Sequence, residues 1–110
     1  MAKTPYINAS ALTALHEITL AAEPNQRFNV NLDGAEWEFT IQTFLDNSTR
    51  ISITKDGEGV CNCAPLTPFK NLTFLSSHEG GMFFFGATTR IEAPTYEMLG
   101  NTLRLYYGYF

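Results

Sequence analysis

Apolar and polar residues alternate through FNVNLDGAEWEF (residues 28–39), and this alternation predicts a β-hairpin. An Asp-Gly pair between alternating segments, here Asp33-Gly34, is typical of a two-residue type I′ turn, which fixes the register of the strands. The predicted apolar pairs are Leu32 with Ala35, Val30 with Trp37 and Phe28 with Phe39. The polar pairs on the opposite face are Asn31 with Glu36 and Asn29 with Glu38. We therefore expect Trp37 to be buried.

Two further turns extend the hairpin into a four-stranded meander over residues 27–60. LDNSTR requires an odd-length loop, for instance residues 46–48, because Ile41 and Ile53 must share the buried face and are expected to be paired. Asn or Ser must then adopt the left-handed conformation that Gly usually supplies. A second Asp-Gly turn follows in TKDGEG, and its predicted pairs are Lys55 with Glu58 and Ile53 with Val60. Such alternation is typical of an antiparallel sheet with one solvated face.

Outside the meander the pattern predicts further short strands. Pro65 and Pro68 lack the backbone N–H that would donate a hydrogen bond to a neighbouring strand, so each marks the end of a strand or the edge of a sheet. The consecutive rings of residues 83–85 suit a strand that is covered on both faces. EITLA (residues 17–21) is a plausible first strand, and NTLRLYYGYF (residues 101–110) alternates as a last one.

The N-terminal segment has two interpretations. SALTALHEI (residues 10–18) places Leu12, Leu15 and Ile18 at helical spacing after Ser10, a residue type that caps helices. A short helix and an extended arm are equally compatible with this pattern. We assign residues 1–15 to the arm or helix.

The elements sum to seven or eight short strands, which predicts an all-β fold, a small antiparallel barrel or sandwich. A chain of 110 residues suits one domain, and no repeat or linker interrupts it. Residues 16–110 are therefore expected to form a single β domain.

Composition narrows the classes of function. Charged residues make up 16% of the chain, below the usual share of about 25%, so much of the surface must be neutral or aromatic. The formal charge of −4 and the pI near 5.0 argue against a nucleic-acid partner. No hydrophobic leader and no apolar run near the roughly 20 residues of a membrane span are visible. We expect a soluble chain that is synthesised in a cytoplasm.

No residue set points to catalysis. Cys61 and Cys63 are spaced as two thiols on one strand face, and the other half of a zinc site is missing. His16 and His78 stand alone. The acidic residues fall on the predicted outer hairpin face or in turns, namely Glu36, Glu38, Asp46, Asp56 and Glu58. We therefore predict a protein that is not an enzyme, with no cofactor and no metal.

Surplus aromatic residues at the C-terminus are the positive signal. Neighbouring strand residues point to opposite faces, so these rings cannot all enter one core. The candidate contact residues are Tyr106, Tyr107, Tyr109 and Phe110. The competing interpretation is an aromatic edge strand covered by the N-terminal segment.

Three segments carry a resemblance to a known family. They are PNQRFNVNLDG (residues 24–34), GGMFFFG (residues 80–86) and PTYEMLGNTLRLYYGY (residues 94–109). Their order and spacing resemble the baseplate plug proteins of contractile-tailed bacteriophages, including cyanophage-type plugs, over roughly residues 16–109. Carried over to this chain, the resemblance implies that Pro24, Asn25 and Gln26 set the start of the first hairpin and that Asp33-Gly34 makes its turn.

The resemblance implies a structural component of the virion that is located in the tail baseplate and synthesised in the bacterial host cytoplasm. Such a plug would pack against the baseplate hub and the tail tube and help to close the channel before contraction. Spike proteins, other baseplate subunits and further copies of the chain are additional candidate partners, whereas no membrane partner is expected.

A carbohydrate-binding or receptor-recognition module of the tail tip is the alternative. Small β-sandwiches can bind sugars by ring stacking, and Trp37 discriminates between the two functions. A sugar platform needs this ring exposed, whereas the predicted register buries it.

Overall fold

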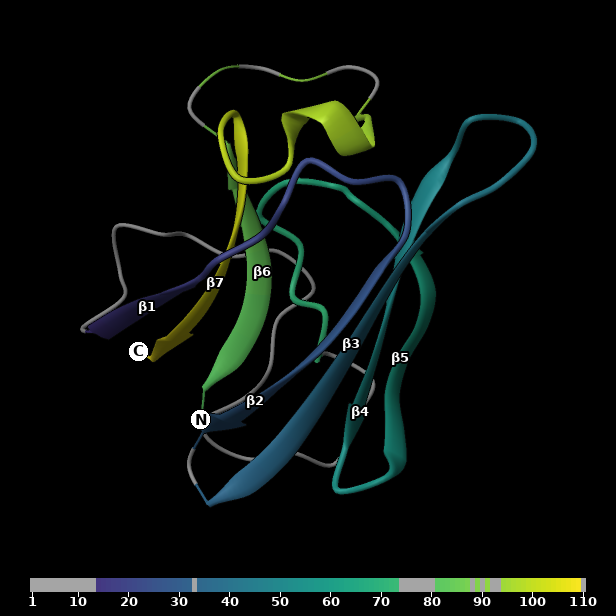
Figure 1. Cartoon of the computed structure of the whole chain (residues 1–110). Coiled ribbons are helices and arrows are strands. Elements are labelled where there is room, and N and C mark those ends of the chain that lie inside the picture. The colour runs from purple at the N-terminus through teal and green to yellow at the C-terminus, as the bar shows by residue number, and fades with distance from the viewer. Residues whose placement is uncertain are drawn as a thin grey trace.

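The computed structural model describes residues 14–32, 34–73, 81–87, 89, 91 and 94–109, which form two antiparallel sheets (Figure 1). One sheet has the strand order β1-β7-β6 and the other β2-β3-β4-β5. The strands are β1 (Ala14–Ile18), β2 (Gln26–Leu32), β3 (Ala35–Thr43), β4 (Thr49–Lys55), β5 (Glu58–Pro65), β6 (Met82–Ala87) and β7 (Leu103–Tyr109), with a 3₁₀ helix η2 (Tyr96–Met98) before β7. The all-β prediction is confirmed. The sheets are not closed into a barrel, so of the two expected architectures the structure has the sandwich.

The predicted register of the first hairpin is confirmed. Phe28 pairs with Phe39, Val30 with Trp37 and Leu32 with Ala35. Trp37 is fully buried, and its indole Nε1 donates a hydrogen bond to the Leu32 carbonyl at 3.3 Å. Asp33 lies outside the described residues, so the predicted turn is described only from Gly34 onward.

The predicted pairing of Ile41 with Ile53 is wrong. Ile41 pairs with Ile51, and Phe39 pairs with Ile53. The loop between the strands is longer than expected because the ladder already ends at Thr43 and Thr49, whose hydroxyls lie 3.0 Å apart. The parity of the loop is nevertheless odd, and Asn47 adopts the expected left-handed conformation with φ 67°.

The hairpin of β4 and β5 starts as predicted and then departs from the regular register. Lys55 pairs with Glu58. Ile53 pairs with Cys61 rather than with Val60, so that prediction is wrong, because a β-bulge accommodates one extra residue on β5. A second register shift follows near Cys63, whose φ is 52°. Strand β5 ends at Pro65 on the edge of the sheet, as its proline predicted.

The first strand begins earlier than predicted. Residues 14–18 form β1, which pairs with β7 along its whole length, rather than residues 17–21. A helix over residues 10–18 is therefore wrong for its described part, because strand pairing outweighs the helical spacing of Leu15 and Ile18. Residues 1–13 lie outside the described residues, and β1 crosses the expected boundary between residues 15 and 16.

The core lies between the two sheets. The ring of Phe83 on β6 is at 4.7 Å from Trp37, 4.9 Å from Phe39 and 4.5 Å from Tyr107, measured between ring centroids. Phe84 points to the opposite face of β6. Strand β6 is thus covered on both faces, as its three consecutive rings predicted.

The segment before β6 covers the free edge of this strand. Phe69 donates its backbone N–H to the carbonyl of Phe85 at 2.6 Å, and Leu72 donates to Phe83 at 2.9 Å. The ring of Phe69 then lies 6.3 Å from the ring of Phe84. Together with Met82 and Tyr106, these residues form a second apolar cluster outside the main core.

Candidate interaction surfaces

Both cysteines lie on the edge strand β5. Cys61 and Cys63 are free thiols. The Cys61 thiol donates to the Ile51 carbonyl at 3.7 Å, and burial raises its pKa. Within the described ranges, no three histidine, cysteine or acidic residues come together as metal ligands, and no helix is long and apolar enough to cross a membrane.

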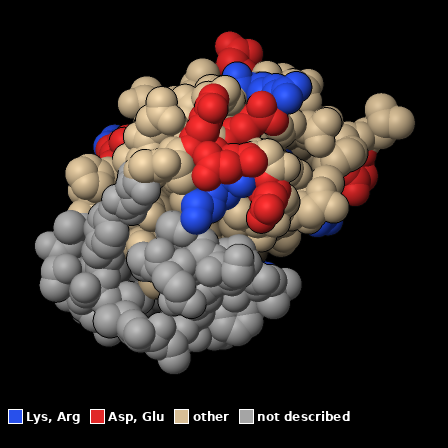
Figure 2. Space-filling view, turned by 90° about the horizontal axis from the view of Figure 1, so that it is seen from below, with Lys and Arg blue, Asp and Glu red and all other residues tan. Residues whose placement is uncertain are grey.

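The acidic residues of the first hairpin lie on the outer face of the four-stranded sheet, as predicted. Glu38 forms an ion pair with Arg27 at 2.8 Å, and Glu36 accepts a hydrogen bond from the Asn29 amide at 3.0 Å. Asp56 accepts from the Glu36 backbone N–H at 2.9 Å and so links two turns. Figure 2 shows acidic and basic side chains intermixed on the face that it presents. This arrangement supports the hairpins and is typical of a solvated face.

The Pro-Asn-Gln motif joins the start of β2 to the end of β3. The carbonyl of Pro24 accepts a hydrogen bond from the Thr43 hydroxyl at 2.7 Å, and the Asn25 side chain accepts from the Thr43 backbone N–H at 3.2 Å. The Gln26 amide donates to the Ala21 carbonyl at 2.7 Å. These three residues therefore hold the open end of the hairpin.

The structure separates the predicted aromatic contact residues. Tyr107 is fully buried among the core rings, whereas Tyr106 points to the opposite face of β7 and is half-buried. Tyr109 ends β7, but its side chain lies outside the described residues, as does all of Phe110. Of the four residues, Tyr106 is the one placed at a described surface.

Tyr106 lines a groove on the outer face of the three-stranded sheet, which we call the outer groove. Its ring packs 5.7 Å from Phe84 and lies over Gly86, where a Cβ atom would be only 2.7 Å from the ring. Leu15, which is 50% exposed, also lines this groove of about 200 Å³. Glycine at position 86 therefore lets the tyrosine ring approach the β6 backbone closely.

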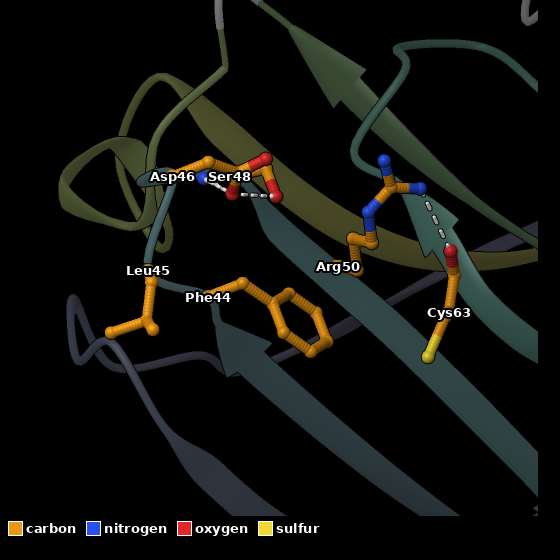
Figure 3. Close-up of a pocket in the computed structure, with 6 residues that line it drawn as sticks. All are labelled: Phe44, Leu45, Asp46, Ser48, Arg50 and Cys63. Atoms are coloured by element: carbon orange, nitrogen blue, oxygen red, sulfur yellow. Dashed lines mark hydrogen bonds between the residues drawn. The ribbon is translucent and has the colours of Figure 1, made fainter.

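A second apolar surface lies at the β3–β4 loop, and we call it the loop pocket (Figure 3). It has a volume of about 610 Å³. Its lining residues are Phe44, Leu45, Asp46, Ser48, Arg50 and Cys63. Leu45 is fully exposed and Phe44 is 42% exposed. Our sequence reasoning missed this surface, although the apolar pair Phe44-Leu45 directly before turn residues was the available signal.

Hydrogen bonds hold the loop in one conformation. Phe44 donates its backbone N–H to the Ser48 carbonyl, and Asn47 donates to the Phe44 carbonyl, both at 2.9 Å. The Asp46 carboxylate accepts from the Ser48 hydroxyl at 2.7 Å and from the Ser48 N–H at 3.0 Å. These last two bonds hold the pKa of Asp46 below its ordinary value.

The pKa of Asp46 gives a test of this loop geometry. The folded loop favours the ionised form of Asp46. The contribution of this carboxylate to the stability of the fold is therefore present above the ordinary aspartate pKa and is lost as the pH falls through the lowered pKa. Replacing Ser48 with alanine should move the pKa of Asp46 back toward its ordinary value in an NMR titration. Ser52→Ala is the matched control and should leave the pKa of Asp46 unchanged. An unaltered titration in Ser48→Ala would contradict the capping role.

These features define a small β-sandwich with an apolar groove and an apolar loop on its surface, a class suited to contacts with other proteins. A family model described as cyanophage baseplate Pam3 plug gp18 matches residues 15–109. The chain belongs to this phage baseplate plug family, and the resemblance seen in the sequence is confirmed. The family name identifies a structural component of the tail baseplate. No curated protein matches the chain.

Proposed function

We propose that this chain is a non-enzymatic virion subunit that packs against the hub and the tail tube of a contractile tail and helps to close the channel before contraction. The family match over residues 15–109 is the observation that carries this proposal. The exposed apolar groove and loop support it, because an assembly subunit buries surface that a monomer leaves in water. The spike, other baseplate proteins and further copies of the chain are the alternative partners.

We assign the contact with the hub or tube to the outer groove around Tyr106. Tyrosine is enriched in protein interfaces because it offers a large area with a polar tip. The ring is held by Phe84 and by the flat surface of Gly86, so little conformational entropy remains to be lost on binding. Leu15 adds an exposed aliphatic side chain beside it.

Point variants test this assignment better than truncation does. Deleting residues 106–110 would also remove Tyr107 from the core, so lost assembly would not identify an interface. We expect the purified chain to form a complex with the hub and tube proteins of the same phage in size-exclusion chromatography with light scattering. Tyr106→Ser and Leu15→Ser should each weaken this complex about tenfold or more, as expected for interface anchors.

Thr54→Ala, on the outer face of the other sheet, is the matched control and should form the complex normally. Thermal melting of each variant checks that the fold is retained. A wild-type chain that ignores both proteins would contradict the plug function. A normal complex with Tyr106→Ser would contradict only the assignment of the outer groove.

The carbohydrate-binding alternative lacks the exposed tryptophan ring that it requires. Trp37 is fully buried, its ring packs against Phe83 at 4.7 Å, and its N–H is directed to the Leu32 carbonyl. The only tryptophan of the chain therefore supports the core and cannot stack on a sugar in this fold. No described feature favours this second function.

A further inference from the structure

The loop pocket places an apolar pair beside a cation. Phe44 directs its ring toward Arg50 and Cys63, whereas Leu45 points away from the sheet into solvent (Figure 3). Arg50 on β4 and Cys63 on β5 form the opposite side of the pocket. This surface belongs to the four-stranded sheet, so it is separate in the fold from the outer groove of the other sheet.

The exposed side chains of the loop stand on a fixed backbone. Four hydrogen bonds within residues 44–48 fix the loop, as described above. A partner that binds here therefore meets a loop whose conformational entropy has already been lost, which favours affinity. A fully exposed leucine on such a loop gains the most from burial, because all of its apolar surface is still in water.

The charge of Arg50 indicates what the partner must carry. One of its guanidinium nitrogens, Nη1, donates to the Cys63 carbonyl at 3.1 Å. In the part of the chain that the structure describes, no carboxylate lies within ion-pair distance of Arg50. Asp46 acts on Arg50 only through a weaker, longer-range attraction between their charges, and its carboxylate accepts two hydrogen bonds from Ser48. The remaining N–H groups of a guanidinium suit a carboxylate, which they can bind through two parallel hydrogen bonds.

We propose that the loop pocket binds an extended segment of a neighbouring baseplate protein that carries an apolar side chain next to an Asp or Glu. The apolar side chain packs against Phe44 and Leu45, and the carboxylate pairs with Arg50. This inference rests on the proposed plug function and adds a second docking surface with a defined partner chemistry. The net charge of −4 repels an acidic segment from the chain as a whole. A cation in the loop pocket therefore directs the acidic segment to this pocket and fixes the orientation of the partner.

Short overlapping synthetic peptides that cover the hub and tube proteins provide the probe. Fluorescence anisotropy of labelled peptides should identify binders in which an acidic residue adjoins an apolar one. Replacing that acid by its amide, Arg50→Gln in the chain, and Leu45→Ser in the chain should each weaken binding about tenfold or more. The peptide amide and Arg50→Gln combined should cost little more than either change alone, because both remove the same ion pair.

Arg27→Gln is the matched control, since Arg27 is an exposed arginine on the outer face of the same sheet and is paired with Glu38. This variant should bind the peptides as the wild type does. Leu45→Ser keeps the test valid if Arg50→Gln unfolds, because Leu45 is fully exposed and its replacement leaves the core intact.

Three results would overturn the proposal. They are the absence of any binding peptide, binding that is indifferent to Arg50 and Leu45, and a concentration-dependent dimer of the chain that Leu45→Ser abolishes. The complex of the full chain with the hub and tube proteins distinguishes failure of the loop-pocket proposal from failure of the plug function. A normal complex of Leu45→Ser with hub and tube would refute the loop pocket alone, whereas no complex of the wild type would refute the plug function.

Discussion

Replacing Phe83 with alanine is expected to lower the free energy of unfolding by about 3–5 kcal/mol, as is usual for a fully buried phenylalanine. This ring is the point at which the two sheets meet, because it contacts Trp37 and Phe39 from one sheet and Tyr107 from the other. The variant loses both the burial of the ring and its edge contacts with the neighbouring rings. A cavity between the sheets cannot close without moving a whole strand.

Urea denaturation followed by circular dichroism measures this loss. Phe44→Ala is the matched control, because it makes the same substitution at a phenylalanine that is 42% exposed in a loop. We expect this control to change stability by about 0.5 kcal/mol or less, as for ordinary surface positions. Equal losses in the two variants would contradict the described core.

Gly100→Ala is the second substitution with a large expected effect. Gly100 has a φ of 82°, and a Cβ atom at this position would clash with the backbone carbonyl oxygen of Leu20. Its N–H also donates to the Leu103 carbonyl at 2.8 Å, which closes the turn before β7. Strain of this kind costs about 1–3 kcal/mol, and here the obstacle is backbone that cannot change rotamer.

The same denaturation experiment tests this position. Gly59→Ala is the control, since a Cβ atom at residue 59 would meet nothing within 4 Å. Its stability should remain within about 0.5 kcal/mol of the wild type. If Gly100→Ala were as stable as Gly59→Ala, the close approach of Leu20 to the turn would be refuted.

The sequence predicted the register of the first hairpin because its turn chemistry and its alternation are both local. Asp-Gly sets a two-residue turn, and a slip by one residue would expose the apolar face. The β3–β4 pairing was less constrained. Every odd-length loop keeps Ile41 and its partner on the buried face, so the parity rule was satisfied by Ile51 as well as by Ile53.

The bulges of β5 could not be predicted for a different reason. Cys63 adopts a positive φ without being glycine, and it is held there by contacts with Ser52 and Arg50 on the neighbouring strand. Such contacts form only in the folded sheet, and no local sequence pattern indicates them.

The candidate surfaces were predicted only in part. The sequence placed Tyr106 and Tyr107 together among the candidate contact residues, whereas the structure buries Tyr107 in the core. The pattern also could not indicate that Gly86 makes room for the Tyr106 ring. The exposure of Leu45 follows from the length of its loop, and that length was the feature that the pattern left open.

The pairing of β1 with β7 has a consequence for synthesis of the chain. These two strands are far apart in the sequence, with Ala14 opposite Tyr109, whereas β2 to β5 pair only with their neighbours in sequence. The meander can therefore form as soon as residues 26–65 have been synthesised, but the three-stranded sheet must wait until β7 has emerged from the ribosome. Because distant contacts form slowly, the outer groove becomes complete only at the end of folding. A nascent chain would thus remain unable to use this groove in assembly until β7 has paired with β1 and β6.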